Sequence, residues 1–455
     1  MAVVLKFGGT SVGTFDAVSR TMDIIASRLP EHPVVCVSAL SKVTDLLYAI
    51  ADAAARGDGA GLDAMMYELR SRHQSLVCSL LSADAEGCAR AAERVDEICG
   101  TLAAVVSSVT ALGDVPDRIR AVIISHGEIL SSTIICYALN SRGVRTGFAD
   151  ARTMIVTDSE YMCGDPQYDL IDKLVPEVVG ECFARGTAFA SDGKASDGNP
   201  NEAVITQGFI AANRLGAGTV LGRGGSDWSA SIIASALGAS RVEIWTDVDG
   251  IRTTDPRVCP NTRRIPRICF EEAAMMARFG AKVLHPKTIA PAMARNIPVY
   301  VLNSSTPSGE GTAVVPGEAP EGPCGIAFKR NVCLVRFSPK ASEDFRRCME
   351  ECRIEPDMLA SAGRQMMVTL DFSYNIGNFI RLVAASTDIL LKTGYSQLTV
   401  IGRGLAALVP ELEKAVPGLR KNFGKMLNDS NISYVVAADR LDALVREVHR
   451  CLFER

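Results

Sequence analysis

The sequence predicts an α/β fold, in which helices cover a largely parallel sheet, followed by two small α+β modules. Residues 1–50 alternate between apolar runs of strand length and amphipathic runs of helix length, which is typical of a parallel sheet. Strand-like runs return after a mainly helical stretch at 60–140. Beyond a segment rich in proline and glycine, 307–323, the pattern changes to two short β-α-β units, which indicates a domain boundary.

Each expected element follows from the spacing of its apolar residues, as Val18, Met22 and Ile25 illustrate for the first helix. In the larger part we expect strands at 3–7, 34–37, 153–156, 203–207, 218–221 and 242–246, and helices at 14–29 and 43–55. In the smaller part we expect strands at 332–337, 366–372, 398–401 and 433–437, and helices at 342–352, 406–415 and up to 453. The polar, turn-rich segment 190–202 predicts a surface loop.

Composition restricts the class of protein. The chain has 455 residues, of which 47% are hydrophobic and 22% charged, as in a soluble globular protein of two or three domains. A net charge of −4 gives no electrostatic reason to expect nucleic acid or an anionic membrane as a partner. We see no apolar run long enough to cross a bilayer and no secretory signal pattern, so we expect a cytoplasmic protein without a membrane partner.

The fourteen cysteines and five histidines show no metal-binding spacing. No pair of cysteines has the Cys-x-x-Cys pattern, and Cys348 and Cys352 lack nearby histidines. We therefore expect small buried thiols in a reducing compartment, and neither a zinc site nor any other protein metal ligand.

Residues 2–11 combine an apolar strand with Lys6, Gly8 and Gly9. Two adjacent residues without Cβ let backbone N–H groups approach an anion, and a lysine adds a point charge for phosphate oxygens. The lysine precedes the glycines, and Thr14 stands where a P-loop needs lysine, so this is not a P-loop. The pattern favours a phosphate site, although an ordinary tight turn would look the same.

A second glycine-rich segment, 219–229, places Arg223 among three glycines before Ser226 and Asp227. An exposed guanidinium beside a helix amino terminus suits a carboxylate or a phosphate, which it can hold through two parallel hydrogen bonds. The alternative is a plain strand-to-helix turn in which Ser226 and Asp227 cap the helix.

Two further segments carry polar groups after apolar runs. In 245–257, Thr246, Asp247 and Asp249 follow a strand and could contact a nucleotide sugar, a metal or a phosphate, or form a turn without any ligand. In 279–286, Lys282 follows a glycine and precedes a helix-stopping proline.

Taken together and in this order, these motifs resemble the aspartate kinase (aspartokinase) family of the amino-acid kinase superfamily. The resemblance also covers 37–44, Gly127-Glu128 and the tail, where 431–436 and 449–454 are similar to paired ACT domains. It implies a monofunctional kinase with a three-layer α/β/α sandwich at 1–306, whose first part binds aspartate and whose second part binds ATP. A linker at 307–324 and two ACT-like (βαββαβ) modules at 325–390 and 391–455 would follow.

The resemblance implies a role for each motif residue. The catalytic residues would be Lys6, Asp227 and Lys282. The aspartate-binding residues would be Ser38, Thr44, Glu128, Arg223 and Ser226. The ATP-binding residues would be Lys6, Gly8, Gly9, Thr10, Ser11, Thr246, Asp247, Arg252, Arg257, Lys282 and Val283. The cofactors would be ATP and Mg²⁺, with Mg²⁺ held mainly by the ATP phosphates.

The implied reaction is attack of the β-carboxylate of aspartate on the γ-phosphorus of ATP. Arg223 would take the α-carboxylate of aspartate and Glu128 its α-ammonium. A carboxylate is already ionised at neutral pH, so positioning and charge neutralisation suffice without a general base. The product, 4-phospho-L-aspartate, would begin the pathway to lysine (through diaminopimelate), threonine and methionine.

Two departures from the family pattern affect these expectations. Arg252 stands where many members carry an apolar or aromatic residue, so its contact with adenosine would differ. Asp357 is followed by 358–364 without the usual Ser-Glu pair, and 427–430 lacks the usual small residues, which argues against lysine as the effector. The ACT-like modules would still bind an amino-acid effector and pair into a homodimer or a larger homo-oligomer.

Two other functions fit parts of this pattern. An amino-acid kinase for another carboxylate, such as that of glutamate, would also use the Glu128 and Arg223 pair. A sensor that binds effectors through ACT-like modules and has lost catalysis is disfavoured by intact Lys6, Arg223, Asp227 and Lys282. Trapping the acyl phosphate with hydroxylamine distinguishes an aspartate kinase from these two alternatives, because it shows which amino acid, if any, is phosphorylated.

Overall fold

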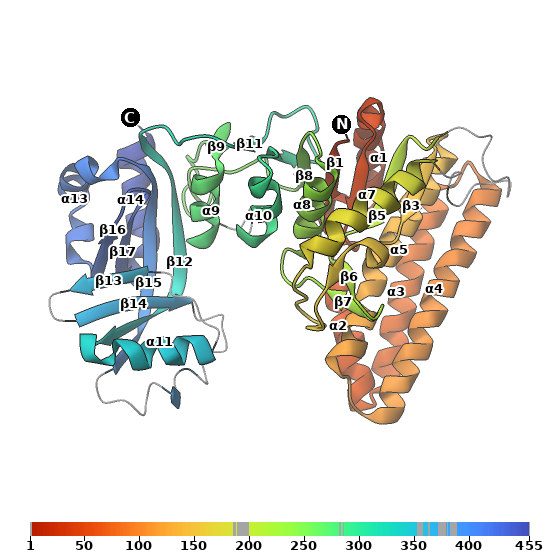
Figure 1. Cartoon of the computed structure of the whole chain (residues 1–455), viewed down its shortest axis with the longest axis horizontal. Coiled ribbons are helices and arrows are strands. Elements are labelled where there is room, and N and C mark those ends of the chain that lie inside the picture. The colour runs from red at the N-terminus through yellow and green to blue at the C-terminus, as the bar shows by residue number, and fades with distance from the viewer. Residues whose placement is uncertain are drawn as a thin grey trace. The chain divides into compact units, whose positions relative to one another are not determined.

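The computed structural model describes residues 2–184, 188, 200–281, 284, 286–352, 358–362, 365–371, 379, 381–382 and 389–454. The chain forms two compact units, whose elements are labelled in Figure 1. Unit 1 comprises Met1–Asp249 and Lys287–Pro316, and unit 2 comprises Gly250–Pro286 and Gly317–Arg455. The catalytic domain predicted at 1–306 therefore spans parts of both units, because the segment 250–286 packs with the carboxyl-terminal part of the chain.

Seven strands of unit 1 form one sheet. Their order is β3 (Thr146–Ala149), β5 (Ala203–Gln207), β2 (Val34–Val37), β1 (Val4–Phe7), β8 (Val242–Thr246), β10 (Val299–Asn303) and β11 (Thr312–Val315). Neighbouring strands are parallel except β10 and β11. Phe7 is in register with both Val37 and Trp245, so three central strands end at one level. The predicted parallel sheet is confirmed.

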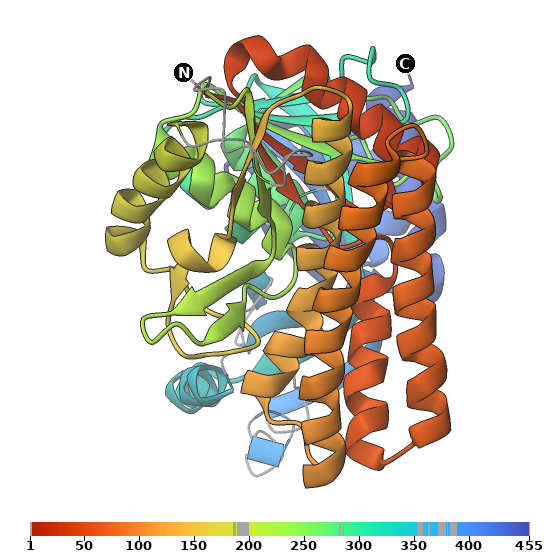
Figure 2. The ribbon, with the colours of Figure 1, turned by 90° about the vertical axis from the view of Figure 1, so that its right-hand side faces the viewer.

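Helices cover both faces of this sheet. In Figure 2, α7 and α8 lie on one side of it and α5 on the other. The same view shows α3, α4 and α5 running side by side, in agreement with their mutual contacts. The helices of unit 1 are α1 (Phe15–Arg28), α2 (Val43–Arg56), α3 (Gly59–Leu80), α4 (Ala85–Leu112), α5 (Asp117–Ser141), α6 (Ala151–Met154), α7 (Tyr168–Ala184), α8 (Gly225–Leu237) and α10 (Pro286–Ala294).

Two expectations for unit 1 need correction. The first half of the predicted strand 153–156 is the end of α6, because the side chain of Asp150 accepts a hydrogen bond from the backbone N–H of Arg152 and caps a helical turn there. A small separate sheet contains β4 (Val156–Thr157), β6 (Ile210–Asn213) and β7 (Gly218–Val220). The predicted linker 307–324 contains β11. Of the predicted loop 190–202, residues 190–199 lie outside the described residues.

Two helices, α4 and α5, are long and apolar enough to cross a membrane by length and composition alone, so the expectation of no such run is wrong. The most apolar window of α5 is 89% buried inside the protein, and α4 packs against α3 and α5. The apolar residues of these helices therefore contribute to a helical core. All fourteen cysteines are free thiols, as expected, but only seven of them are buried, so the expectation of buried thiols is half right: Cys78 and Cys163 are exposed and five others are half-buried.

Unit 2 contains a six-stranded sheet. Its order is β13 (Met358–Ala362), β14 (Gln365–Asp371), β12 (Gly322–Phe337), β15 (Ile389–Arg403), β17 (Asn431–Ala437) and β16 (Gly424–Leu427), and all neighbours are antiparallel. Its helices are α11 (Ser342–Glu351), α13 (Val409–Ala415) and α14 (Leu441–Phe453), with a short 3₁₀ turn at Leu405–Leu408 before α13. The segment 250–286 adds β9 (Arg267–Cys269) and α9 (Phe270–Arg278).

Unit 2 has two main hydrophobic cores, in agreement with two α+β modules. One core includes Val335, Phe345 and Leu370 beside α11, and the other includes Ile326 and residues of α13 and α14. The strands predicted at 332–337 and 398–401 are parts of the longer β12 and β15, and the first half of β12 packs into the second core. The segment 357–364 is the one from which we expect that lysine is not the effector. Its residues 357, 363 and 364 lie outside the described residues.

Candidate functional site

Polar residues gather at the edge where β1, β2 and β8 end. Because parallel strands end on the same side of a sheet, the loops that follow them lie close together. A pocket of about 350 Å³ opens there, within unit 1. Its walls are Lys6, Gly9, Ser38, Ala39, Lys42, Thr44, Asp45, Glu128, Phe209, Gly222, Gly224, Gly225, Ser226 and Asp227.

Lys6 and Asp227 form an ion pair on the wall of this pocket. The Lys6 Nζ lies 2.7 Å from the Asp227 Oδ1, and both side chains are largely buried. Lys6 comes from β1 and Asp227 from the first turn of α8, so the pair joins a strand end to a helix amino terminus. The pair holds the lysine ammonium at a point where the α8 dipole also favours an anion.

The expectation that Ser226 and Asp227 cap α8 is wrong. The residue before the helix is Gly224, whose φ of 71° is in the left-handed region that favours glycine, and no side chain caps the helix. Ser226 and Asp227 lie inside the first turn, so their side chains line the pocket without bonding the helix end.

Glu128 presents a buried carboxylate to the pocket. Its Oε1 accepts a hydrogen bond from the backbone N–H of Ala39 at 3.1 Å. Its Oε2 is buried and has no hydrogen-bond partner among the described residues. Burial raises the pKa of this carboxyl to about 8, against the lowering effects of backbone hydrogen bonds and of Lys6. An unpartnered buried carboxylate oxygen in a pocket suits a cationic ligand group.

Gly127 lets α5 come close enough to place Glu128 in the pocket. A Cβ at this position would lie 2.8 Å from the Cβ of Ala39, in the loop after β2. The helix therefore packs against that loop at a distance that only glycine allows without a shift.

Gly127→Ala is expected to destabilise the protein by about 1–3 kcal/mol, because the added methyl group overpacks this contact. It should also raise the KM for the amino-acid substrate. The control is Gly100→Ala in α4, where a Cβ would meet no atom within 4 Å and helix propensity should stabilise by about 0.5–1 kcal/mol. Urea unfolding measures both changes. Equal effects in the two variants would show that the contact with Ala39 is unimportant.

The glycine turn after β1 lies beside the end of β8. The backbone N–H of Gly8 donates to the Trp245 carbonyl at 3.2 Å. The buried Ser11 hydroxyl bonds the Ser304 hydroxyl at 2.8 Å and donates to the Trp245 carbonyl, so it holds the turn against the neighbouring strands. Thr10 is exposed at the same turn. The Thr246 hydroxyl donates to Asp247 at the end of β8, outside the pocket wall.

Several predicted residues are not brought to this pocket. Arg223 is exposed between Gly222 and Gly224, which do line the pocket. Arg252 and Arg257 belong to unit 2, where Arg252 donates to the Thr262 carbonyl at 3.0 Å and Arg257 pairs with Asp255. Lys282 and Val283 lie outside the described residues.

The pocket wall also contains residues that were not among the predicted site residues. They are Ala39, Lys42, Asp45, Phe209, Gly222, Gly224 and Gly225. Lys42 precedes α2, and its φ of 65° is unusual for a residue other than glycine. Phe209 has a φ of 67°. A lysine just before a predicted helix was the available signal for Lys42, whereas nothing in the sequence marked Phe209.

Comparison with known proteins shows the family of the chain. Residues 1–303 match the model of the amino acid kinase family. The chain is also 31% identical to the lysine-sensitive aspartokinase 3 of Escherichia coli (strain K12), over 99% of both chains. The chain belongs to the aspartokinases of the amino acid kinase family.

Two solved structures of an aspartokinase resemble the whole chain. The E. coli aspartokinase III in complex with aspartate and ADP (R-state) matches with a TM-score of 0.83 and 28% identity, covering 100% of both chains. The E. coli aspartokinase III in complex with lysine and aspartate (T-state) matches with a TM-score of 0.76 and 28% identity, covering 99% of both chains. The fold, a kinase sandwich followed by ACT-type modules, is therefore that of this family.

Proposed function

We propose that this aspartokinase transfers the γ-phosphoryl group of ATP to the β-carboxylate of L-aspartate, forming 4-phospho-L-aspartate and ADP. The observation that carries the proposal is the unpartnered Glu128 Oε2 in the same pocket as the Lys6–Asp227 pair. The pocket thus offers an anionic group for an ammonium and a cation for a phosphate. A small amino acid that accepts a phosphoryl group needs both.

In the proposed complex, Glu128 binds the α-ammonium of aspartate through Oε2. Ser38, Thr44 and Ser226 supply polar atoms on the pocket wall. Arg223 is positioned at the rim between two wall glycines, and its side chain would turn inward to take the α-carboxylate. These contacts would leave the β-carboxylate directed at Lys6.

The reaction then depends on position and charge. A β-carboxylate oxygen forms a bond to the γ-phosphorus while the bond to the bridging oxygen breaks and ADP leaves. Lys6 neutralises negative charge on the transferring group, and Asp227 keeps its ammonium in place. Besides Glu128, the pocket wall carries two carboxylates, those of Asp45 and Asp227, which are oxygen donors of the kind that Mg²⁺ takes, although Asp227 is already paired. When bound with ATP, Mg²⁺ would offset charge on the phosphates.

The ATP side of the proposal rests on residues near and beyond the pocket. Gly8, Gly9, Thr10 and Ser11 form the turn under the phosphates, and Thr246 with Asp247 lies at the end of the adjacent strand. Arg252, Arg257, Lys282 and Val283 complete the proposed ATP contacts. We further propose an amino-acid effector at the ACT-type modules, a homo-oligomer, a cytoplasmic location and a place at the first step of the lysine, threonine and methionine pathway.

A hydroxylamine assay tests this proposal. The purified full chain is given Mg-ATP with aspartate or glutamate, and the acyl phosphate is trapped as a hydroxamate. We expect aspartyl hydroxamate with aspartate and little product with glutamate. Product with glutamate alone would assign the chain to a different carboxylate, and no product with either would favour a sensor without catalysis.

A further inference from the structure

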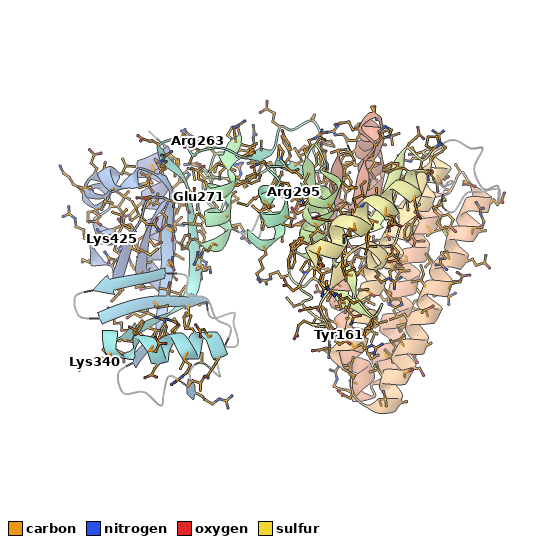
Figure 3. The ribbon with its side chains drawn as sticks, in the orientation of Figure 1. Tyr161, Arg263, Glu271, Arg295, Lys340 and Lys425 are labelled. Atoms are coloured by element: carbon orange, nitrogen blue, oxygen red, sulfur yellow. The ribbon has the colours of Figure 1, made fainter. Side chains whose placement is uncertain are left out.

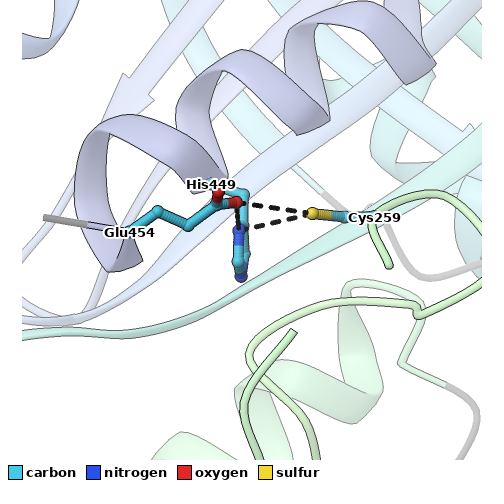
Figure 4. Close-up of side chains that lie close together, drawn as sticks. All are labelled: Cys259, His449 and Glu454. Atoms are coloured by element: carbon cyan, nitrogen blue, oxygen red, sulfur yellow. Dashed lines mark hydrogen bonds and ion pairs between the residues drawn. The ribbon is translucent and has the colours of Figure 1, made fainter. Parts of the chain in front are cut away.

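Three potential metal ligands lie close together in unit 2, although one of them is far from the other two in the sequence. Cys259 comes from the loop between β8 and β9, and His449 and Glu454 come from α14 and its carboxyl-terminal end. Figure 4 shows the three side chains directed at one another. The sequence spacing gave no sign of this cluster, because the fold joins residues that are 190 positions apart.

The three donor atoms form a small triangle. The Cys259 Sγ lies 3.3 Å from the His449 Nδ1 and 3.9 Å from the Glu454 Oε1, and the last two atoms are 2.8 Å apart. Bond lengths of about 2.0 Å to N and O and about 2.3 Å to S around a tetrahedral zinc ion place such atoms about 3.3–3.6 Å apart. Shifts of about half an ångström would therefore let all three atoms bind one ion.

Neighbouring residues orient the imidazole and the carboxylate. The His449 Nε2 lies 2.9 Å from the Thr253 hydroxyl, which also accepts a hydrogen bond from the backbone N–H of Arg263. Arg263 is labelled in Figure 3. The Glu454 Oε2 accepts from the Asn261 side chain at 3.1 Å, which leaves Oε1 for the cluster. A ring nitrogen held by an outer partner while the other nitrogen faces the ligand set is usual for histidines that bind metal.

Burial and donor chemistry point to the class of ion. Cys259 and His449 are buried, and the Glu454 side chain is partly exposed, so Glu454 lies on the solvent side of the cluster. One thiolate, one imidazole and one carboxylate are ligands that zinc accepts together, whereas Mg²⁺ and Ca²⁺ prefer oxygen alone. A water molecule would fill the fourth position.

We propose that Cys259, His449 and Glu454 bind a zinc ion that fastens the loop between β8 and β9 to α14. Val258, next to Cys259, already packs into the core formed by α13 and α14. The same loop carries Arg252 and Arg257. The ion would therefore also fix these two residues to α14 in the ACT-type part of the chain, and their role as ATP contacts rests on the proposed function. Zinc binding itself does not depend on the proposed function.

Metal titration of the full chain tests this proposal. After chelation and buffer exchange, the wild-type protein is expected to bind one Zn²⁺ per chain at this cluster and to melt at a higher temperature with Zn²⁺. With Co²⁺ as a probe, it should show the charge-transfer absorption of a cobalt–thiolate bond. Cys259→Ser should lose that absorption and weaken Zn²⁺ affinity at least about 100-fold, and Thr253→Ala should weaken it about 10–100-fold.

Matched variants separate a metal site from a hydrogen-bonded cluster. Serine keeps a hydroxyl beside His449, so a cluster held by hydrogen bonds alone would tolerate Cys259→Ser and show no cobalt–thiolate absorption. Glu454→Gln, at a partly exposed position, guards against a folding defect and should also weaken Zn²⁺ binding. Cys99 is a buried thiol of α4, outside the cluster, and Cys99→Ser should leave Zn²⁺ binding unchanged. The proposal would be overturned if the wild-type protein did not bind Zn²⁺, or if Cys259→Ser and Glu454→Gln left Zn²⁺ binding unchanged. Either result stands whatever the kinase assay shows.

Discussion

A Lys6→Met enzyme is expected to lose about 10³-fold in kcat, with a smaller change in the KM for aspartate. Lys6 is the buried cation of the pocket, and its partner Asp227 would remain there as an uncompensated carboxylate beside the ATP phosphates. Removing one preorganised charge-stabilising group from an active site typically lowers the rate by about 10²–10³-fold. Release of ADP, followed with a coupled assay, measures the loss.

Two controls show whether the loss arises in the site. Lys173→Met changes an exposed lysine of α7 and should leave kcat unaltered. Asp227→Asn should also lower kcat strongly, and the double variant should lose less than the product of the single losses, because the two residues act as a pair. Near-normal turnover of a folded Lys6→Met enzyme would show that this lysine does not serve phosphoryl transfer.

Glu128→Gln is expected to raise the KM for aspartate about 10–100-fold while the protein stays folded. The variant keeps the shape of the side chain but loses the charged acceptor for the ammonium group, and a hydrogen bond between charged groups contributes about 1.5–3 kcal/mol. Glu272→Gln is the matched control. Glu272 is also buried and lies outside this pocket, and its Oε1 has no hydrogen-bond partner in the part of the chain that the structure describes. An unchanged KM in Glu128→Gln would place the ammonium elsewhere.

The pKa of Glu128 gives this variant a pH signature. Burial raises the pKa to about 8, so below that pH the free pocket holds a proton that aspartate must displace. The wild-type KM for aspartate should therefore rise roughly tenfold per unit as the pH falls from 8 to 6, and the KM of Glu128→Gln should not follow. Without ligand, the effect on stability has the opposite direction. The raised pKa stabilises the folded state at low pH, and this contribution is lost as the pH rises from about 4.5 to about 8.

The parallel sheet was predictable because its signal is local. Apolar runs such as 34–37, 203–207 and 242–246 match β2, β5 and β8 residue for residue. The strands β3 and β6 were missed because their apolar runs are very short, since β3 begins with threonine and glycine and β6 ends with asparagine. The helical turn at 151–154 depends on one side chain, that of Asp150, which outweighs the apolar alternation around it.

The remaining features depend on contacts between distant residues. Val258 packs against residues beyond 398, so no local pattern assigns the segment 250–286 to unit 2. The family resemblance pointed to Glu128. The burial of this side chain and of its unpartnered Oε2, however, follows from the approach of α5 to the loop at Ala39. Cys259, His449 and Glu454 carry no common spacing, and only the fold brings them together.

Proton exchange on aspartate binding tests the central claim, that Glu128 in this pocket receives the amino group of the substrate. Calorimetric titrations at pH 7 in two buffers with different heats of ionisation measure the protons released per aspartate bound. Because the free Glu128 carboxyl has a pKa of about 8, the wild-type protein should release about one proton, and Glu128→Gln should bind weakly and release none. Aspartate binding without proton release, or equal release by both proteins, would contradict the claim.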